Sequence, residues 1–542
     1  MLFDRRFLCR LVLLLPLAAV VFFCFFYLFH DYNALARWYE SLPGPFYRKP
    51  YWRAEFFTPQ TWQKGRLWCG LALVICPILI WAVLKVRFPE KQRWERADGL
   101  ATILIASVAL ALGIFSASIP EIAMDEDQSA MFFGSTHPFR ALSHYPVPNN
   151  HILYNTLNSL VATPETALLW GKIIAILGYA GGGIITYRWL LVWNTPRHAA
   201  VLMTLLSLTI FPAWGFSGQA RSYTLYLLAS WWALLLATRY LRTNDARNLA
   251  LYPVAVAVGY GMLPTFIYFH VGLCMWGLGQ CLINRQILWP FWRAQVFAVA
   301  ASFLVLLPLL SFSGLRAIAG HQWVAPMPWS DFTFPPFGPF RDYFTGYGKL
   351  GYLLGILAAL GAVALLFRKK TRLLGSLTIA LWIGCDVVVA IMRQTPFTRQ
   401  LMGLYSVSAV VGLLAAFYLL QILATRFGAK WFYPVAALTG LATSVAVMAV
   451  NHERLADALY LYNVAERNSK IEAMLDRIPE GTSVGFTDNA FLPKALWQRR
   501  GKAIVPAEKA LYLVQLEDVN PVYPSDSLVA SYINIRVYKK SR

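Results

Sequence analysis

The sequence predicts an all-α polytopic membrane protein with about 13 transmembrane helices, followed by a small α/β domain. Of its 542 residues, 58% are hydrophobic and only 14% are charged, whereas a soluble domain is about half apolar and about a quarter charged. Apolar runs of roughly 20 residues, the length that crosses a bilayer, recur along most of the chain. The last 90 or so residues are polar and show shorter periodicities.

Thirteen apolar stretches are candidates for membrane spans. The first follows Arg5, Arg6 and Arg10, but it is long for a cleavable signal sequence and no small-residue cleavage site follows it, so a retained span is predicted. The eighth is the shortest. The predicted spans are 11–29, 67–86, 99–119, 167–190, 199–216, 223–241, 249–268, 270–284, 294–312, 350–367, 373–391, 402–424 and 431–450.

The basic residues predict the orientation of these spans. The net charge of +21 lies in short clusters between apolar runs, such as "KVRFPEKQRWER", "RYLRTNDAR" and "RKKTR". Such clusters mark cytoplasmic loops, and they differ from the continuous basic face of a nucleic-acid-binding protein. The long loop 30–66 is also basic but is rich in aromatic residues, and we predict that it lies outside. The N-terminus is then cytoplasmic and the C-terminus extracytoplasmic.

Residues 452–542 are predicted to form a small extracytoplasmic α/β domain. The segment "ERLADALYLYNVAERNSKIEAMLDRI" has helical periodicity, and "TSVGFTD", "KAIVP", "ALYLVQL" and "SYINIRVYKK" resemble short strands. The seven cysteines all lie in or beside apolar segments without metal-binding spacing, which indicates small buried side chains. Asn-x-Ser/Thr is absent, which favours a bacterial cytoplasmic (inner) membrane over a glycosylating compartment.

An acidic cluster follows the third predicted span. Glu121, Asp125, Glu126 and Asp127 fall within seven positions of a chain that has few acids, and the topology places them on the outer loop 120–165. The same loop carries His151 before an amphipathic stretch. At about 40 residues it is long enough to be functional.

Further polar residues reach the same side. "SGQARSYTLY" joins the fifth and sixth spans and carries Arg221 and Tyr223, while "MRQTPFTRQLMGLY" joins the eleventh and twelfth spans and carries Arg399. Asp386 lies inside the eleventh span, where an ionisable residue is a functional candidate by default. His270 begins the eighth span.

Together these groups are suited to a lipid-phosphate substrate. A carboxylate can take the proton of a hydroxyl group, and arginine binds phosphate oxygens with two parallel hydrogen bonds. Each group also has a simpler explanation: the acids are solvated on a loop, the arginines anchor turns at the membrane surface, and Asp386 pairs with a neighbouring cation. The shared outer position of all these groups favours the functional interpretation.

The order of these motifs resembles the GT-C glycosyltransferases, polytopic enzymes that use lipid-phosphate sugars and include protein O-mannosyltransferases and the aminoarabinose transferase acting on lipid A. The resemblance rests on "MDEDQ" after a span, "NNHILYNTLNSL" in the same loop, "ARSY" in a later outer turn and "TRQLMGLY" before the last spans. It covers roughly residues 99–450. Two extra spans in residues 1–98 precede the GT-C-like region 99–451.

The resemblance implies an inverting transfer of a sugar from a polyprenyl-phosphate donor to a hydroxyl of a glycan, lipid or protein. Asp125 would be the base, and Glu126 would orient the base or the acceptor. Donor-phosphate binding would fall to Arg221, Arg399, His151 and Tyr223, with Asp127, Asp386 and His270 as accessory residues. Some members use a divalent metal ion, for which Asp125, Asp127, His151 and His270 could supply ligands, but no spacing requires one.

Other classes of membrane protein remain as alternatives. A secondary transporter would show repeated halves and interrupted spans in matching positions, and no convincing internal repeat is present. A polymerase or ligase of lipid-linked glycans would also bind polyprenyl phosphates through outer arginines, but it would leave the Asp-Glu loop unexplained. A receptor or scaffold is a third alternative.

Overall fold

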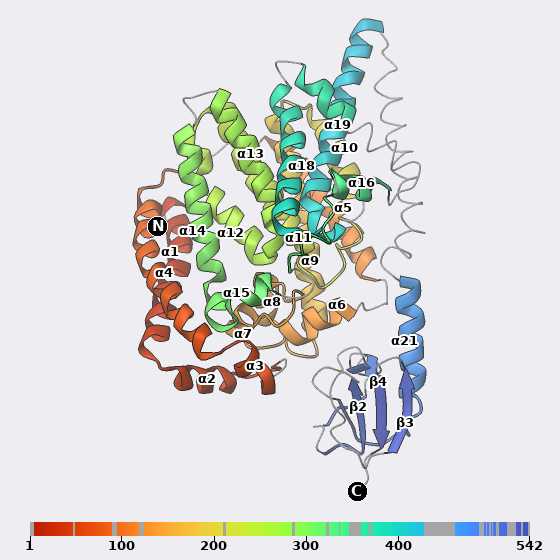
Figure 1. Ribbon diagram of the computed structural model, residues 1–542. Coiled ribbons are helices and arrows are strands. Elements are labelled where there is room, and N and C mark those ends of the chain that lie inside the picture. Colours follow the sequence, from red (N-terminus) through yellow and green to blue (C-terminus); the bar gives the residue numbers. More distant parts are fainter. Residues whose placement is uncertain are drawn as a thin grey trace.

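Helices make up most of the described part of the chain, and the longest are apolar (Figure 1). The structure is a computed structural model. It describes residues 5–46, 49–88, 95–118, 124–209, 213–283, 288–320, 325–334, 336–345, 359–367, 371–427, 461–486, 493, 494, 496, 497, 500, 502–505, 509–516, 527–532 and 535–539.

Eight of the described helices include a stretch long and apolar enough to cross a membrane, which identifies a multi-pass membrane protein. Seven of them correspond to predicted spans. The eighth predicted span, 270–284, corresponds to a membrane-length stretch that begins at Pro264. The helices are α1 (Arg5–Phe29), α4 (Pro59–Lys85), α5 (Arg96–Ala117), α9 (Ala167–Val192), α13 (Ile267–Ile283), α14 (Leu288–Phe312), α18 (Arg372–Met392) and α19 (Met402–Phe427).

Two predicted spans are wrong in extent. In place of 199–216 the chain forms α10 (Arg197–Leu208), and in place of 249–268 it forms α12 (Tyr252–Met262). At 1.5 Å per residue these helices are roughly 17–18 Å long, well short of the ~30 Å hydrocarbon core of a bilayer. Pro264 explains the second break, because it lacks the N–H that would continue the helix. A short 3-10 turn, η3 (Pro264–Phe266), then leads into α13.

The remaining predicted spans differ in how far the structure describes them. The predicted span 223–241 is a helix, α11 (Tyr223–Thr243), but it is too polar to count among the eight. It is buried along most of its length and packs against α9, α12 and α19. The predicted span 350–367 lies partly outside the described residues, and 431–450 lies wholly outside them.

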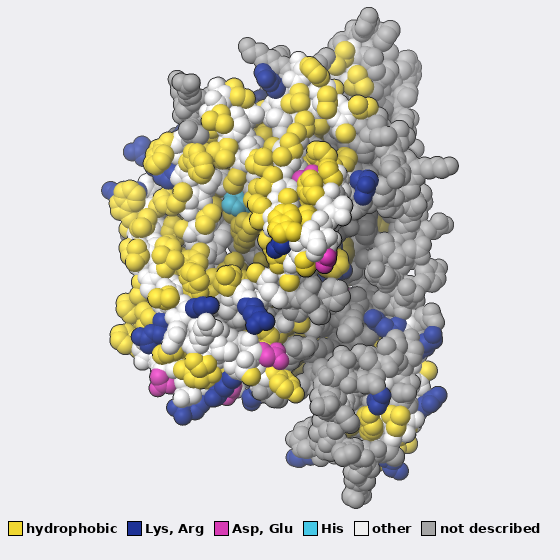
Figure 2. Space-filling view, in the orientation of Figure 1, with side chains coloured by type: hydrophobic (Ala, Val, Ile, Leu, Met, Phe, Trp, Pro, Cys, Tyr) yellow, Lys and Arg dark blue, Asp and Glu magenta, His cyan; other side chains and the backbone are white. Residues whose placement is uncertain are grey.

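The N-terminal hairpin of α1 and α4 has a hydrophobic core of its own. It joins the rest of the bundle through Leu304, Leu307 and Phe312 of α14. Figure 2 shows a broad apolar band across this face of the molecule, with Lys, Arg, Asp and Glu side chains gathered below it. That distribution is expected for helices surrounded by lipid.

Short helices cover the ends of the bundle where the acidic loop lies. In chain order they are α2 (Tyr32–Ser41), α3 (Lys49–Glu55), α6 (Met124–Asp127), the π-helical turn η1 (Gln128–Phe133), α7 (Pro138–Ser143), α8 (Ile152–Ser159), α15 (Gly314–Ala319), α16 (Gly338–Thr345) and η5 (Thr398–Leu401). The 3-10 turn η2 (Ala246–Leu249) instead follows the far end of α11 and leads into α12.

Arg140 on α7 joins the loop that follows α2 to the acidic loop. Its buried guanidinium donates to the carbonyl oxygens of Leu42 (2.5 Å), Gly44 (2.9 Å) and Pro45 (3.1 Å), and it lies over the ring of Phe46. A buried cation needs such partners, because an uncompensated charge is costly away from water. Arg140 therefore fixes the N-terminal hairpin against the loop that carries Asp125.

The C-terminal part of the chain contains a helix and a four-stranded sheet. The sheet order is β1-β2-β4-β3, with β1 parallel to β2 and the other pairs antiparallel. "KAIVP" does not form a strand, and "SYINIRVYKK" divides between two strands. The elements are α21 (Leu461–Leu475), β1 (Val484–Phe486), β2 (Tyr512–Leu516), β3 (Ser527–Tyr532) and β4 (Ile535–Lys539).

Candidate active site

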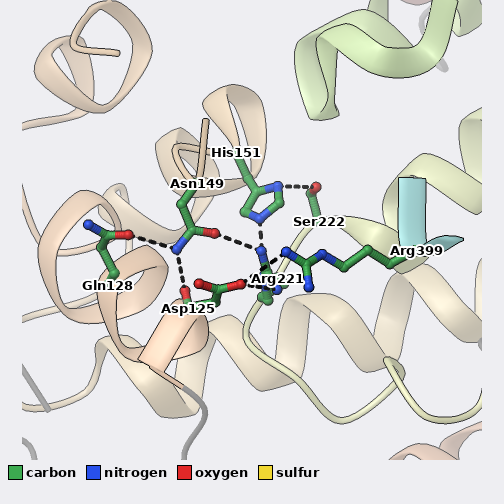
Figure 3. Close-up of polar contacts among 7 residues, drawn as sticks. All are labelled: Asp125, Gln128, Asn149, His151, Arg221, Ser222 and Arg399. Carbon is green, nitrogen blue, oxygen red and sulfur yellow. Dashed lines mark hydrogen bonds and ion pairs between the residues drawn. The ribbon is translucent and has the colours of Figure 1, made fainter. Parts of the chain in front are cut away.

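Asp125 lies between two arginines that come from distant parts of the sequence. Its Oδ2 atom is 3.2 Å from a guanidinium nitrogen of Arg221 and 3.3 Å from one of Arg399 (Figure 3). The Asp125 side chain is 42% exposed. The structure thus brings the predicted base and both predicted phosphate-binding arginines to one place, with the carboxylate still open to an incoming molecule.

The turn before α11 positions Arg221. Gly218 in this turn lies so close to the end of α5 that a Cβ atom would be 2.2 Å from the backbone nitrogen of Ala117. Only glycine permits such an approach between backbones. The turn is therefore held against α5, and Arg221 extends from it toward α6 and α8.

The guanidinium of Arg221 is almost fully buried, and its N–H groups donate to named partners in the cluster. Nε donates to Nε2 of His151 at 3.2 Å, and a terminal nitrogen donates to Oδ1 of Asn149 at 2.6 Å. The group also lies 4.8 Å above the ring of Tyr223. Because these contacts fix the plane of the guanidinium, the nitrogen facing Asp125 is held in one direction.

His151 is a neutral hydrogen-bond acceptor in this cluster. Its Nε2 accepts from Arg221, so the ring proton is on Nδ1, which lies 2.8 Å from Oγ of Ser222. Ser222 in turn donates to the carbonyl oxygen of Met262. Burial and the nearby charges of Arg221 and Arg399 hold the pKa of His151 well below its ordinary value of 6.5. At neutral pH the imidazole therefore orients Arg221 without adding positive charge.

Gln128 and Ser222 are functional candidates that the sequence did not single out, and Asn149 was noted only as a polar residue before the amphipathic stretch. The amide of Asn149 donates to the backbone oxygen of Asp125 at 2.8 Å and to Oε1 of Gln128 at 2.9 Å, while its oxygen accepts from Arg221. Asn149 thus links the α6 turn to the arginine. Its position two residues before His151 was the available signal.

Glu126 has a different environment from its neighbour Asp125. It is buried, and its Oε1 accepts a hydrogen bond of 2.8 Å from the backbone nitrogen of Ala220. This bond joins the α6 turn to the turn that carries Arg221. Glu126 is thus held in a buried structural contact, whereas the Asp125 side chain is partly exposed.

Arg399 comes from η5 and is the more accessible of the two cations. Its side chain is 33% exposed and also lies 4.9 Å from the ring of Phe397. Since the Arg221 side chain is only 5% exposed, an anion entering from the open side would reach Arg399 first.

Asp386 and His270 lie elsewhere. Asp386 on α18 accepts a hydrogen bond from the backbone nitrogen of Phe337 at 2.8 Å. His270 on α13 is bonded to Tyr260 and Gln295. Both make contacts within or beside the helix bundle, and neither has a described contact with Asp125. The side chain of Asp127 is outside the described residues.

The residues around Asp125 do not fit a divalent metal ion. Two guanidinium groups lie within 3.3 Å of its carboxylate, and they would repel a metal cation. The Nε2 lone pair of His151 already accepts from Arg221. Within the described part of the chain, no group of three or more His, Cys, Asp or Glu side chains is placed to hold a metal.

We expect the folded protein to lose stability below pH 6.5 partly because of His151. The unfolded chain binds a proton at the ordinary pKa of 6.5, whereas the folded chain resists protonation until a much lower pH. The stability is therefore fully present above pH 6.5 and is lost as the pH falls toward the folded pKa. Thermal unfolding of the purified protein measures this loss of stability. The pH should be varied between about 8 and 5, the range in which histidine titrates.

The matched pair of variants for this measurement is His151→Gln and His198→Gln. His198 is exposed, so its removal should leave the pH profile unchanged. The His151→Gln profile should be flatter than that of the parent protein. Identical profiles for the parent and His151→Gln would show that His151 is not held neutral in the fold.

Comparison with known proteins finds similarity to solved structures alone. No protein-family model and no curated protein matches the sequence. The solved structures that match include ArnT from Cupriavidus metallidurans without ligand (12% identity, TM-score 0.49, 82% of this chain and 98% of that one). They also include the same protein bound to undecaprenyl phosphate (13%, 0.44, 80% and 97%) and the arabinosyltransferase EmbB from Mycobacterium smegmatis (13%, 0.39, 66% and 34%).

ArnT and EmbB are GT-C glycosyltransferases, the superfamily that the sequence motifs of this chain resemble. All three TM-scores lie below 0.5. A proposal for the function must therefore come from this chain's own side chains.

Proposed function

We propose that this chain is an inverting glycosyltransferase that moves a sugar from a polyprenyl-phosphate donor to a hydroxyl on an extracytoplasmic glycan, lipid or protein. The observation that carries the proposal is the Asp125 carboxylate held between Arg221 and Arg399. Arginine binds phosphate oxygens through two parallel hydrogen bonds, and a carboxylate can take the proton of a hydroxyl group.

The present contacts of Asp125 support an exchange of partners when the donor binds. Without a donor, the single negative charge of the carboxylate offsets part of the positive charge of the two guanidinium groups. A donor phosphate would take over that role, because arginine binds phosphate through paired, charge-assisted hydrogen bonds. Asp125 would then turn its half-exposed carboxylate toward the acceptor.

Transfer follows from this arrangement in one displacement. The acceptor oxygen forms a bond to the anomeric carbon while the bond from that carbon to the phosphate oxygen breaks. The hydroxyl proton passes to Asp125, and the electron pair of the broken bond leaves on polyprenyl phosphate. Arg221 and Arg399 stabilise the charge that develops there, which is where fixed positive groups contribute most. Attack opposite the leaving phosphate inverts the anomeric carbon.

The test of the proposal uses purified protein with a panel of polyprenyl-phosphate sugars and hydroxyl acceptors. Free polyprenyl phosphate and glycosylated acceptor should form in equal amounts. Reconstituted liposomes separate this outcome from transport. Movement of an intact sugar donor across the bilayer without release of polyprenyl phosphate would identify a transporter and refute the proposal.

The proposed location is the cytoplasmic membrane of a bacterium, with the N-terminus in the cytoplasm and the site and residues 452–542 outside. The basic loops support this orientation. Residues 1–98 would then be an added hairpin and 99–451 the catalytic membrane region.

We therefore expect an impermeant thiol reagent to label a cysteine at Glu165 in intact cells and to miss one at Thr243. Both side chains are exposed, so the side of the membrane on which each lies decides whether it is labelled. A background lacking the seven native cysteines removes other signals. Labelling of Thr243→Cys but not Glu165→Cys would reverse the topology and place the site on the cytoplasmic side.

A further inference from the structure

A large apolar cavity lies between the N-terminal hairpin and the rest of the bundle. Its volume is about 700 Å³. None of the residues of the Asp125 cluster lines it, so it is separate from the candidate active site. Its walls come from α1, α4, α12 and α14 and include Leu17, Phe23, Leu79, Val254, Phe297 and Leu304.

The cavity is as long as a membrane is thick. It follows α14 from Pro290 to Pro308, a rise of roughly 27 Å, and the hydrocarbon core of a bilayer is ~30 Å thick. An apolar space of this kind is not filled by water. In a membrane it must be occupied by hydrocarbon.

The only charges in the lining are two cations at one end. Lys85 is in the last turn of α4 and Arg293 is near the start of α14, and no acidic residue lines the cavity. The described part of the chain gives neither side chain a hydrogen bond or an ion pair. Arg10 of α1 donates to the backbone oxygen of Val86, so three helices meet at this end.

The opposite end offers nothing for an anion. Phe139, Leu142 and Leu153 line it, and the site arginines do not reach it. A polyprenyl-phosphate chain held in this cavity would have its phosphate at the wrong end for Arg221 and Arg399. Basic pockets between membrane helices on the cytoplasmic side characteristically bind phospholipid headgroups.

We propose that the cavity binds an anionic phospholipid, with its acyl chains between the hairpin and α12 and its phosphate between Lys85 and Arg293. The lipid would fill the space that separates the added hairpin from the catalytic bundle. The proposal is independent of the transfer reaction, because it uses no residue of the Asp125 cluster.

The experiment is native mass spectrometry of the full chain incubated with phosphatidylglycerol, phosphatidylcholine or a polyprenyl phosphate. The parent protein should retain phosphatidylglycerol in preference to phosphatidylcholine. Lys85→Ala combined with Arg293→Ala should weaken that binding roughly 30-fold, the value expected for the loss of two cations near a headgroup. The matched control combines Arg37→Ala with Lys64→Ala, two exposed cations on α2 and at the start of α4.

A second variant tests the binding of the acyl chains separately from the binding of the headgroup. Ala301→Phe places a ring in the cavity and should displace the lipid while both cations remain. Retention of phosphatidylglycerol by the double alanine variant at the parental level would overturn the proposal, as would equal retention of both phospholipids by the parent. Retention of the polyprenyl phosphate alone would instead assign the cavity to the donor chain.

Discussion

Asp125→Asn protein is expected to fold and insert normally and to transfer sugar about 10²–10⁴ times more slowly than the parent, the usual loss when a general base is removed. Asparagine keeps the shape of the side chain but cannot take the hydroxyl proton. Because Asp125 is 42% exposed, its ion pairs should stabilise the fold by only ~1 kcal/mol or less. Single-turnover transfer and thermal unfolding measure the two effects.

Two neighbouring substitutions sharpen this test. Glu165→Gln removes an exposed carboxylate from the same loop and should leave transfer unchanged. Glu126→Gln disturbs the bond to the Ala220 backbone, so it should reduce transfer less than Asp125→Asn and lower the unfolding temperature more. Near-parental turnover by well-folded Asp125→Asn protein would disprove its assignment as base. If Glu126→Gln protein is inactive and Asp125→Asn protein is active, Glu126 is the base and Asp125 is the positioning residue.

Arg221→Ala is expected to weaken donor binding and to slow transfer by about 10²–10³, the range found for removing one preorganised group that stabilises developing negative charge. Arg221→Lys retains the charge but loses the planar pair of donors, so it should also be impaired. Donor affinity and single-turnover rate distinguish binding from catalysis. Arg399→Ala should mainly affect donor binding, because that side chain is less firmly held.

Arg316→Lys supplies the control for these variants, since Arg316 is exposed on α15 and has no described contact with the site. If Arg221 and Arg399 only anchor their turns at the membrane surface, their substitution would lower insertion or stability and leave donor affinity intact. In that case Arg393 or Arg341 would be the next candidates for the phosphate site.

The sequence pointed to the charged residues of this cluster but not to the hydrogen bonds that connect them. Asp125, Arg221 and Arg399 were identifiable because they interrupt apolar sequence in a chain with few charges, and the loop pattern placed them on one side. The bonds among Asn149, Gln128, His151 and Ser222 were not identifiable. They depend on how α6, α8 and the turn before α11 pack, and no sequence spacing encodes that packing.

Hydropathy likewise predicted where helices occur but not where they break. Spans 199–216 and 249–268 were drawn too long because apolar residues continue past the helix ends. For the second span the signal was Pro264, which interrupts the hydrogen bonding before α13. That break contributes to the site, because the carbonyl oxygen of Met262 at the end of α12 accepts a hydrogen bond from Ser222.

The most direct test of the Asp125–Arg221–Arg399 assignment is a density map of the parent protein with a polyprenyl-phosphate sugar bound. Phosphate density should lie between Arg221 and Arg399, with the Asp125 carboxylate moved away from them and toward the anomeric carbon. The same map of the Arg221→Ala variant should show that density weakened. Phosphate density elsewhere, with Asp125 still paired to both arginines, would contradict the assignment and would make the cluster a structural ion pair.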